Sequence, residues 1–124
     1  MSNIKNVSPK EAQLLIRKGA VLIDVREPRE LSRMAFDVES CMNIPLSRIE
    51  QRHQEIPANK QVIVACQRGN RSLAASRFLI SHGHRKLVNL QGGISRWAGE
   101  GMAVKQEPKQ SLLARILQLF SKKA

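Results

Sequence analysis

Apolar residues recur along the chain with two different spacings, and the change between them predicts alternating strands and helices. Short, mostly apolar runs are typical of strands buried on both faces, and three stand out: 21–23, 62–65 and 87–90. Apolar residues at helical spacing fill the stretches 9–18, 45–55 and 72–82. The alternation predicts an α/β fold with a mainly parallel central sheet and helices on both faces.

Start and stop residues frame the first predicted helix. Ser8, Pro9 and Glu11 have the spacing of a helix N-terminus with a capping box, in which the Ser8 and Glu11 side chains bond each other's backbone N–H groups. Gly19 stands where the helix should stop. We interpret these residues as scaffold.

Two shorter helices and a further strand complete the predicted domain. A helical piece spans 28–33, and the paired glycines 92–93 turn the last strand into a short helix that contains Trp97. A strand is expected within 34–42. Trp97 is interpreted as a core anchor, because a lone tryptophan on a short helix packs inward more often than it binds a ligand.

The residues beyond Val104 form a separate region. Residues 105–110 are a polar linker, and 111–120 place six apolar side chains on one arc at helical spacing. We therefore divide the chain into a domain at 1–104 and a tail at 105–124. The amphipathic helix is too short to span a bilayer. Three interpretations of this helix stay open: it packs on the domain, it pairs with a partner protein, or it lies in a membrane interface.

Basic residues outnumber acidic ones by 21 to 10, which gives a net charge of +11. Residues 105–124 carry +4 of this charge and residues 1–104 carry +7. A field of this sign attracts small anions. Nucleic acid is not an expected partner, because only 3% of the residues are aromatic, Tyr is absent and no nucleic-acid-binding motif is present.

Length and cysteine count fit a single intracellular domain. A chain of 124 residues is long enough for one domain with a real core. Its two cysteines, Cys41 and Cys66, do not make a disulfide framework, and residues 1–7 lack the apolar core of a signal peptide. We expect a reducing, cytoplasmic setting, with peripheral attachment to a membrane through 111–120 as the alternative.

The histidines do not predict a metal site. His53, His82 and His84 do not have metal-ligand spacing with either cysteine. Neither a metal nor a cofactor is expected.

The candidate chemistry lies between Gln61 and Ile80. Cys66 follows the strand 62–65, and a tight loop leads from it into the N-terminus of the next helix. Ligands of open α/β sheets bind at this carboxyl edge of the strands. A helix N-terminus with neighbouring arginines lowers the pKa of a cysteine, and successive backbone N–H groups that curve round a point bind anions.

The loop residues add to this prediction. Gly69 permits the positive φ that such a curve often needs, and Arg68 and Arg71 supply guanidinium groups that can hold an oxyanion at two points. We therefore predict a reactive sulfur beneath a pocket for a small anion. The alternative is that Cys66 is an inert, buried side chain beneath a solvated loop.

The motif C-x-x-G-x-R-S at residues 66–72 resembles the active-site loop of rhodanese-like sulfurtransferases. Three further matches follow the order of that family: LIDVRE at 22–27, NIPL at 43–46 and LQGGISRW at 90–97. The resemblance covers about residues 4 to 104. It implies a rhodanese-like three-layer fold.

The resemblance also implies an activity. Cys66 would take a sulfane sulfur from thiosulfate or a persulfide donor, become a persulfide, and pass the sulfur to a thiol or cyanide acceptor. Arg71 would close the loop, while Asp24 and Ser72 would support it. The implied substrate-binding residues are Gln67, Arg68, Gly69, Asn70 and Arg71.

One segment departs from the family. Residues 34–42 read MAFDVESCM, where the family has a Gly-His-Ile-x-Gly-Ala-like sequence. Cys41 lies in this segment. We interpret it as a small core residue, and a thiol that condenses with oxidised Cys66 is the alternative.

Two functions from other classes stay open. Cysteine phosphatases and arsenate reductases use a related loop with five residues between Cys and Arg. Only four separate Cys66 from Arg71, and the shorter loop suits a single sulfur atom better than a phosphoryl group. The second alternative function is that of a non-catalytic, rhodanese-like binding module. The presence of Cys66 and its loop argues against this alternative.

Overall fold

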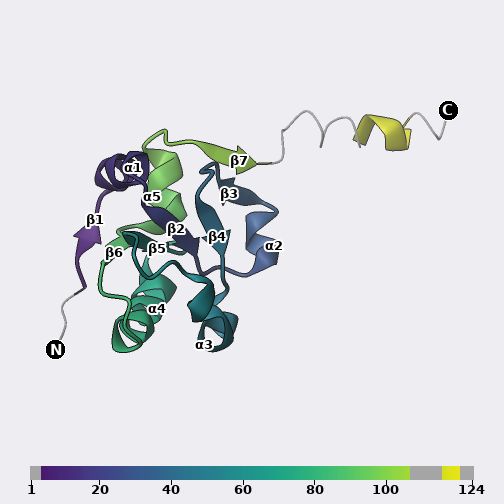
Figure 1. Ribbon diagram of the computed structural model, residues 1–124. Helices are drawn as coiled ribbons and strands as arrows, with labels where there is room; N and C mark the ends of the chain where they lie inside the picture. Colours follow the sequence, from purple (N-terminus) through teal and green to yellow (C-terminus); the bar gives the residue numbers. More distant parts are fainter. Residues whose placement is uncertain (1–3, 107–115, 121–124) are drawn as a thin grey trace.

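The computed structural model describes residues 4–106 and 116–120. Its centre is a five-stranded parallel sheet with the strand order β1-β6-β5-β2-β4. Figure 1 shows this sheet in the middle of the domain. The strands are β1 (Asn6–Val7), β2 (Val21–Asp24), β4 (Cys41–Asn43), β5 (Val62–Ala65) and β6 (Leu87–Leu90).

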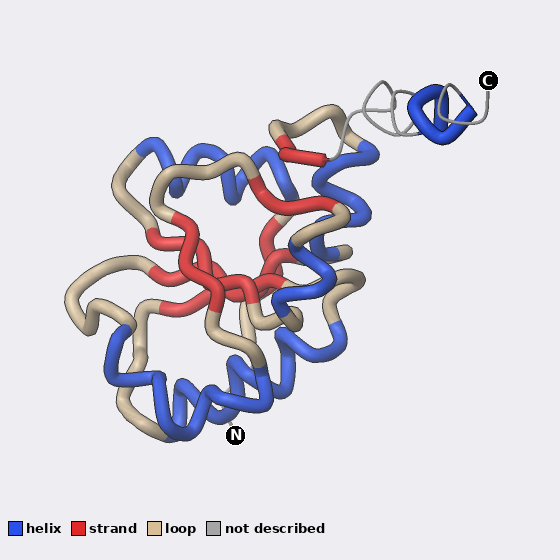
Figure 2. Tube along the Cα trace, turned by 90° about the vertical axis from the view of Figure 1, so that its right-hand side faces the viewer, coloured by secondary structure: helices blue, strands red, loops and turns tan. Residues whose placement is uncertain are grey.

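Helices cover both faces of the sheet (Figures 1 and 2). On one face lie α1 (Pro9–Arg17) and α5 (Gly93–Gly99); on the other lie α3 (Ile49–Arg52) and α4 (Asn70–Ser81). Turns of 3₁₀ helix flank α3 at Leu46–Arg48 and His53–Glu55. The predicted three-layer α/β fold is confirmed.

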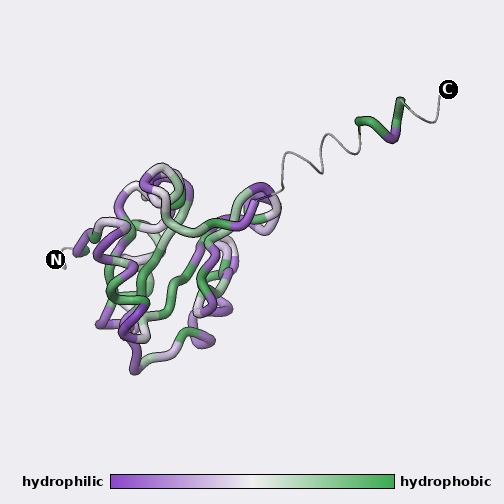
Figure 3. The backbone as a smooth tube through the Cα atoms, turned by 90° about the horizontal axis from the view of Figure 1, so that it is seen from above, coloured by the Kyte–Doolittle hydropathy of each residue, from purple (hydrophilic) through white to green (hydrophobic). Residues whose placement is uncertain are grey.

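The two layers of helices enclose two separate apolar cores. Side chains alternate between the faces of a strand, so Val21 and Ile23 point to the α3 and α4 side while Leu22 points to the α1 and α5 side. Trp97 is 2% exposed and packs edge-on against Phe36, as expected of a core anchor. In Figure 3 apolar residues, in green, run through the centre of the domain.

The predicted capping box is present at the start of α1. The Glu11 backbone N–H donates to Ser8 Oγ (3.2 Å), and the Ser8 backbone N–H donates to Glu11 Oε1 (3.0 Å). The chain then leaves the helix at Gly19, whose φ is +104°. Local sequence thus marks where this helix begins and ends.

The buried face of α4 carries hydroxyl groups as well as apolar side chains. Its buried residues are Ser72, Ala75, Ser76 and Leu79, while Ala74 is exposed. The buried serines bond nearby carbonyl groups: the Ser72 hydroxyl donates to the Gly69 carbonyl oxygen (3.1 Å), and the Ser76 hydroxyl donates to the Ser72 carbonyl oxygen (2.7 Å). Small residues let the helix lie close to the sheet beside Cys66.

The segment that was expected to hold a single strand forms two. Strand β3 (Met34–Phe36) pairs antiparallel with β7 (Val104–Gln106), and β4 pairs parallel with β2. The β3–β7 ribbon stands beside α2 (Pro28–Leu31). Strand β7 continues two residues beyond Val104, so Lys105 and Gln106 are paired with the domain. Strands of two or three residues are too short to show a pattern in the sequence.

The C-terminal segment is described only at residues 116–120, which are helical. Four apolar side chains there are exposed, by 41% at Ile116, 66% at Leu117, 65% at Leu119 and 68% at Phe120. Figure 1 draws this segment away from the domain. The expected helix over 111–120 therefore lies half outside the described residues. Within residues 4–106 and 116–120, no helix has the length and apolar character needed to cross a membrane.

Candidate active site

Cys66 stands directly after β5, at the carboxyl edge of the sheet, and α4 begins four residues later. The turn between them depends on Gly69, whose φ of +111° lies in the region that side chains disfavour. This short turn brings Cys66, the backbone of the loop and the first turn of α4 to one point. The predicted strand–loop–helix arrangement is present.

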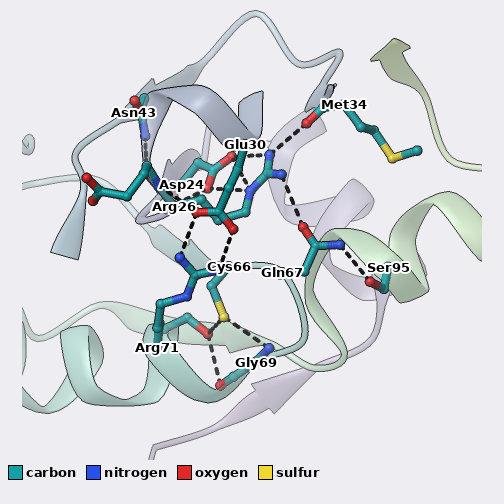
Figure 4. A network of polar contacts seen from close by, with 12 residues as sticks. Asp24, Arg26, Glu30, Met34, Asn43, Cys66, Gln67, Gly69, Arg71 and Ser95 are labelled. Carbon is teal, nitrogen blue, oxygen red and sulfur yellow. Dashed lines mark hydrogen bonds and ion pairs between the residues drawn. The ribbon is translucent and has the colours of Figure 1, made fainter. Parts of the chain in front are cut away.

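The Cys66 sulfur lies among hydrogen-bond donors (Figure 4). The Gly69 backbone N–H donates to Sγ over 3.0 Å, and the Ser72 hydroxyl lies 3.4 Å from Sγ. Burial alone would raise the pKa of this thiol. The Ser72 hydroxyl and the backbone N–H groups of Ser72, Gly69 and Arg68 outweigh burial and lower its pKa. The site therefore favours a thiolate, although the residue is only 1% exposed.

Helix α5 orients the loop that supplies these donors. The Ile94 N–H donates to the Cys66 carbonyl oxygen (2.9 Å), and the Ser95 N–H donates to the Gln67 carbonyl oxygen (3.1 Å). In a trans peptide the N–H points opposite to the C=O. Because the Gln67 carbonyl faces α5, the Arg68 N–H in the same peptide faces the sulfur.

The glycines at the start of α5 make this approach possible. A Cβ on Gly93 would collide with the carbonyl oxygens of Cys66 and Gln67, and its φ of +58° also disfavours a side chain. The absence of a side chain at Gly93 therefore lets α5 pack directly against the loop backbone.

A buried ion pair supports the loop from the neighbouring strand. Arg26 donates to Asp24 through Nε (3.1 Å to Oδ1) and Nη2 (2.8 Å to Oδ2), and both side chains are 1% exposed. Arg26 Nη1 also donates to Gln67 Oε1 (3.4 Å), and Gln67 Nε2 donates to Ser95 Oγ (2.9 Å). Asp24 thus pairs with Arg26 and acts on the loop through it.

Arg71 forms an ion pair that the sequence did not predict. Its Nη1 and Nη2 donate to the two carboxylate oxygens of Glu30, each over 2.7 Å. Arg71 lowers the pKa of Glu30 to about 2, and Glu30 in turn raises the pKa of Arg71. A cavity of about 420 Å³ opens beside this pair, lined by Glu27, Arg29, Glu30, Arg33 and Arg71.

The remaining predicted residues have exposed side chains. Arg68 and Asn70 both point to solvent at the loop surface, and Asn70 is the first residue of α4. The loop residues are thus brought together mainly through their backbone. Sequence reasoning missed Arg26, Glu30 and Ser95. Arg26 and Ser95 lie in the family-like stretches 22–27 and 90–97, and Glu30 follows Pro28 in the first turn of a helix, so each had a local signal but none indicated its partner.

Cys41 lies on the other face of the sheet. It packs with the α1 and α5 core, whereas Cys66 belongs to the α3 and α4 core. Strand β2 stands between the strands that carry them. Burial raises the pKa of Cys41 to about 12. Both observations speak against a resolving thiol and fit a small core residue.

Metal ligands do not gather in the described part of the chain. Across residues 4–106 and 116–120, the His, Cys, Asp and Glu side chains form no group of three or more that could hold a metal ion.

Comparisons with known proteins agree with this geometry. The profile of the rhodanese-like domain matches residues 8–100. A sulfurtransferase of Allochromatium vinosum is 32% identical over 87 residues, which cover 70% of this chain and 79% of that protein. The thiosulfate sulfurtransferase GlpE of Pseudomonas syringae pv. syringae is 29% identical over 97 residues, covering 78% and 90%.

Solved structures show the same fold. A rhodanese-related protein of Thermoplasma volcanium has a TM-score of 0.73 at 32% identity, covering 83% of this chain and 99% of that one. The polysulfide-sulfur transferase homodimer of Wolinella succinogenes has a TM-score of 0.76 at 27% identity, covering 86% and 81%.

Proposed function

The chain belongs to the rhodanese-like domain family, and on that premise we propose that it is a sulfurtransferase that carries a sulfane sulfur as a persulfide on Cys66. Relatives named as sulfurtransferases support this activity at the level of the family. The observation that carries the proposal is the set of backbone N–H groups and the Ser72 hydroxyl around Sγ, which favour a thiolate.

In the first step the Cys66 thiolate attacks the outer sulfur of the donor. A bond forms between Sγ and that sulfur, and the donor's sulfur–sulfur bond breaks. Its electron pair leaves with sulfite when the donor is thiosulfate, or with a thiolate when the donor is a persulfide. The N–H groups of Arg68, Gly69 and Ser72 stabilise the negative charge on the bound sulfur.

In the second step an acceptor attacks the outer sulfur of the Cys66 persulfide. A thiolate acceptor becomes a persulfide and cyanide becomes thiocyanate, while the electron pair of the broken bond returns to Cys66 as a thiolate. Cys66 attacks as a thiolate in this proposal, so the first step requires no histidine base, and the lowered pKa of Cys66 supports that form.

Intact mass measurement tests this proposal. After incubation with thiosulfate or a persulfide, the full chain should gain the mass of one sulfur atom, and cyanide should remove it. Cys66→Ala should gain nothing at this site. If no donor loads sulfur onto the wild-type chain, the non-catalytic binding module becomes the better assignment. Release of phosphate from an aryl phosphate, lost in Cys66→Ala, would instead favour the phosphatase.

We propose a separate attachment role for the tail, in a cytoplasmic protein. The exposed apolar side chains of Ile116, Leu117, Leu119 and Phe120 support binding to another surface rather than packing on the domain. Basic residues on both sides, at Arg115 and 122–123, favour an anionic membrane surface over an uncharged one. Co-sedimentation with anionic vesicles should require residues 107–124, and equal sedimentation of a chain lacking them would argue against attachment.

A further inference from the structure

Two adjoining cavities open at the edge of the sheet opposite to Cys66. They have volumes of about 410 Å³ and 240 Å³, and three residues line both of them: Leu15, Lys18 and Gln61. Gln61 directly precedes β5, whereas Cys66 directly follows it. Because the strands of the central sheet are parallel, the shared wall marks the amino edge of the sheet, and Cys66 lies at the carboxyl edge. We call the two cavities together the amino-edge groove.

Part of the lining of the amino-edge groove is apolar. Helix α1 and strand β1 lie side by side (Figure 1) and supply Leu14, Leu15 and Val7 to it. Leu14 is 54% exposed, and within residues 4–106 it is the only large apolar side chain so open to solvent. A single exposed leucine is ordinary on a protein surface. Leu14 differs because it lines a cavity together with the partly buried Leu15, so the two offer a partner a continuous apolar surface.

The charged part of the lining is mostly basic. Lys5, Lys18 and Lys60 line the groove, and all three are exposed. In the part of the chain that the structure describes, none of these lysines belongs to an ion pair. The one acidic residue of the lining is Glu11, whose carboxylate already takes part in the capping box of α1. The groove therefore presents an excess of positive charge beside an apolar surface.

We propose that the amino-edge groove binds an acidic peptide segment of a partner protein. An apolar side chain of this segment contacts Leu14 and Leu15, and its carboxylates pair with the three lysines. Because the groove and Cys66 lie at opposite edges of the sheet, this partner binds without covering the reactive sulfur.

Charge and shape favour this partner over the other occupants of such a surface. Residues 105–124 carry +4 and residues 1–104 carry +7, so neither the tail nor a second copy of the chain complements three lysines. An anionic membrane has the right charge, but it contacts the side chains that protrude around a groove. A peptide segment enters the groove itself.

Titration of the full chain with a short synthetic peptide tests the groove. The probe alternates leucine with aspartate and glutamate, and two matched peptides replace either the leucines by serine or the acids by their amides. At physiological ionic strength, which screens loose attraction to a basic protein, we expect the probe to shift the backbone amide resonances of residues 14–20 and 59–61 most. Both matched peptides should bind at least tenfold more weakly.

Substitutions then locate the contact. Lys18→Gln combined with Lys60→Gln should weaken binding of the probe at least tenfold, and Leu14→Ala should weaken it severalfold. Lys10→Gln combined with Arg77→Gln is the matched control, because it removes the same charge from exposed positions outside the groove and should change the affinity less than twofold. All five side chains are exposed, so each variant should fold.

Three outcomes would overturn the groove as a peptide site. The first is no binding of the probe, or equal affinity for wild type and the Lys18, Lys60 variant. The second is an unchanged affinity for the peptide in that variant with loss of co-sedimentation with phosphatidylserine vesicles, which would assign the lysines to a membrane. The third is a block of sulfur loading on Cys66 by saturating peptide, which would place the peptide at the active-site loop.

The same experiment keeps the groove separate from the proposed function. Saturating peptide should leave the rate of sulfur loading on Cys66 within twofold. A chain that loads no sulfur but binds the probe at the amino-edge groove would refute the sulfurtransferase and support the peptide site.

Discussion

The two cysteines of this chain are both largely enclosed, and their surroundings drive their pKa values in opposite directions. Burial raises the pKa of Cys41 to about 12. Burial acts on Cys66 as well, but donors aimed at the sulfur lower its pKa. The comparison teaches that enclosure alone does not set the pKa of a thiol; the Ser72 hydroxyl and the backbone N–H groups around the Cys66 sulfur outweigh it.

Position along a strand explains the difference. Cys41 lies within β4, where the backbone pairs with β2, and its own N–H donates to the Val38 carbonyl oxygen (3.1 Å). Cys66 stands just past the end of β5, where the chain turns and its N–H groups are released from the ladder. The same residue type is therefore inert inside a strand and ionisable one step beyond the end of another.

The largest expected effect is on activity, when each cysteine is replaced in turn. Cys66→Ala should reduce thiocyanate formation from cyanide and the best sulfur donor by about 10³-fold or more, because the nucleophile is lost. Cys41→Ala should keep activity within about twofold of wild type. Substantial activity in Cys66→Ala, or its loss in a folded Cys41→Ala, would contradict the contrast.

The second prediction removes the support of the loop. Gly93→Ala forces a Cβ against the Cys66 and Gln67 carbonyl oxygens, so we expect about 2–4 kcal/mol less stability and at least a tenfold loss of activity. Denaturant unfolding and the transferase assay measure these two quantities.

Gly83→Ala is the matched control for this change. Gly83 also has a positive φ, of +94°, but nothing lies within 4 Å of its added Cβ. Gly83→Ala should lower the free energy of unfolding by about 1–2 kcal/mol through backbone strain alone. The activity per folded molecule should stay unchanged. Equal activity in Gly93→Ala and Gly83→Ala would show that α5 does not orient the loop.

The third prediction concerns the Ser72 hydroxyl. This group helps to lower the pKa of Cys66, so Ser72→Ala should raise that pKa and move the pH profile of alkylation by iodoacetamide to higher pH. At neutral pH we expect alkylation and sulfur loading to slow by roughly threefold to tenfold.

Ser76→Ala controls for the loss of a buried hydroxyl. Ser76 lies one turn further along α4 and bonds the Ser72 carbonyl rather than the sulfur. The pH profile of alkylation in Ser76→Ala should match that of wild type. An unshifted profile in Ser72→Ala would mean that backbone N–H groups alone set the ionisation of Cys66.

The smallest predicted effect is on stability at alkaline pH. The Cys41 thiol has a folded-state pKa of about 12, above its ordinary value of 9.0, so the unfolded chain loses this proton first as pH rises. Stability therefore falls above pH 9. Between pH 8 and 9.5 this thiol should lower the free energy of unfolding by about 0.8 kcal/mol.

Urea unfolding of wild type and Cys41→Ala at the two pH values measures this effect. The pH-dependent loss should be smaller in Cys41→Ala by that amount, since all other groups are shared. Parallel curves for the two proteins would show that Cys41 ionises in the folded state as it does in the unfolded chain.

Local and periodic signals were enough to predict the central fold. The capping box at Ser8 and Glu11 depends on residues three apart, and the strands at 21–23, 62–65 and 87–90 are mostly apolar because both faces are buried. Strands β1 and β7 were not predicted, and the segment 34–42 was expected to hold one strand rather than both β3 and β4. Their two or three residues are partly exposed and gain order only from partners far along the chain.

In the candidate site, too, contiguous features could be predicted and contacts between distant residues could not. Cys66 and its loop could be predicted, since their motif is contiguous in sequence. Glu30 could not be paired with Arg71, because 41 residues separate them and either side chain alone is an ordinary surface charge. Ser72 was named through the motif, whereas buried Ser76 was missed because a periodicity of apolar residues does not count hydroxyls.

The contacts from Ile94 and Ser95 to the loop also bear on the order in which the chain is made. Cys66 leaves the ribosome well before residues 93–99, which orient its loop. Until those residues have been synthesised and folded, the loop lacks the two hydrogen bonds through which α5 orients it. A chain that ends before α5 therefore keeps the cysteine and its loop sequence but loses the helix that orients the loop.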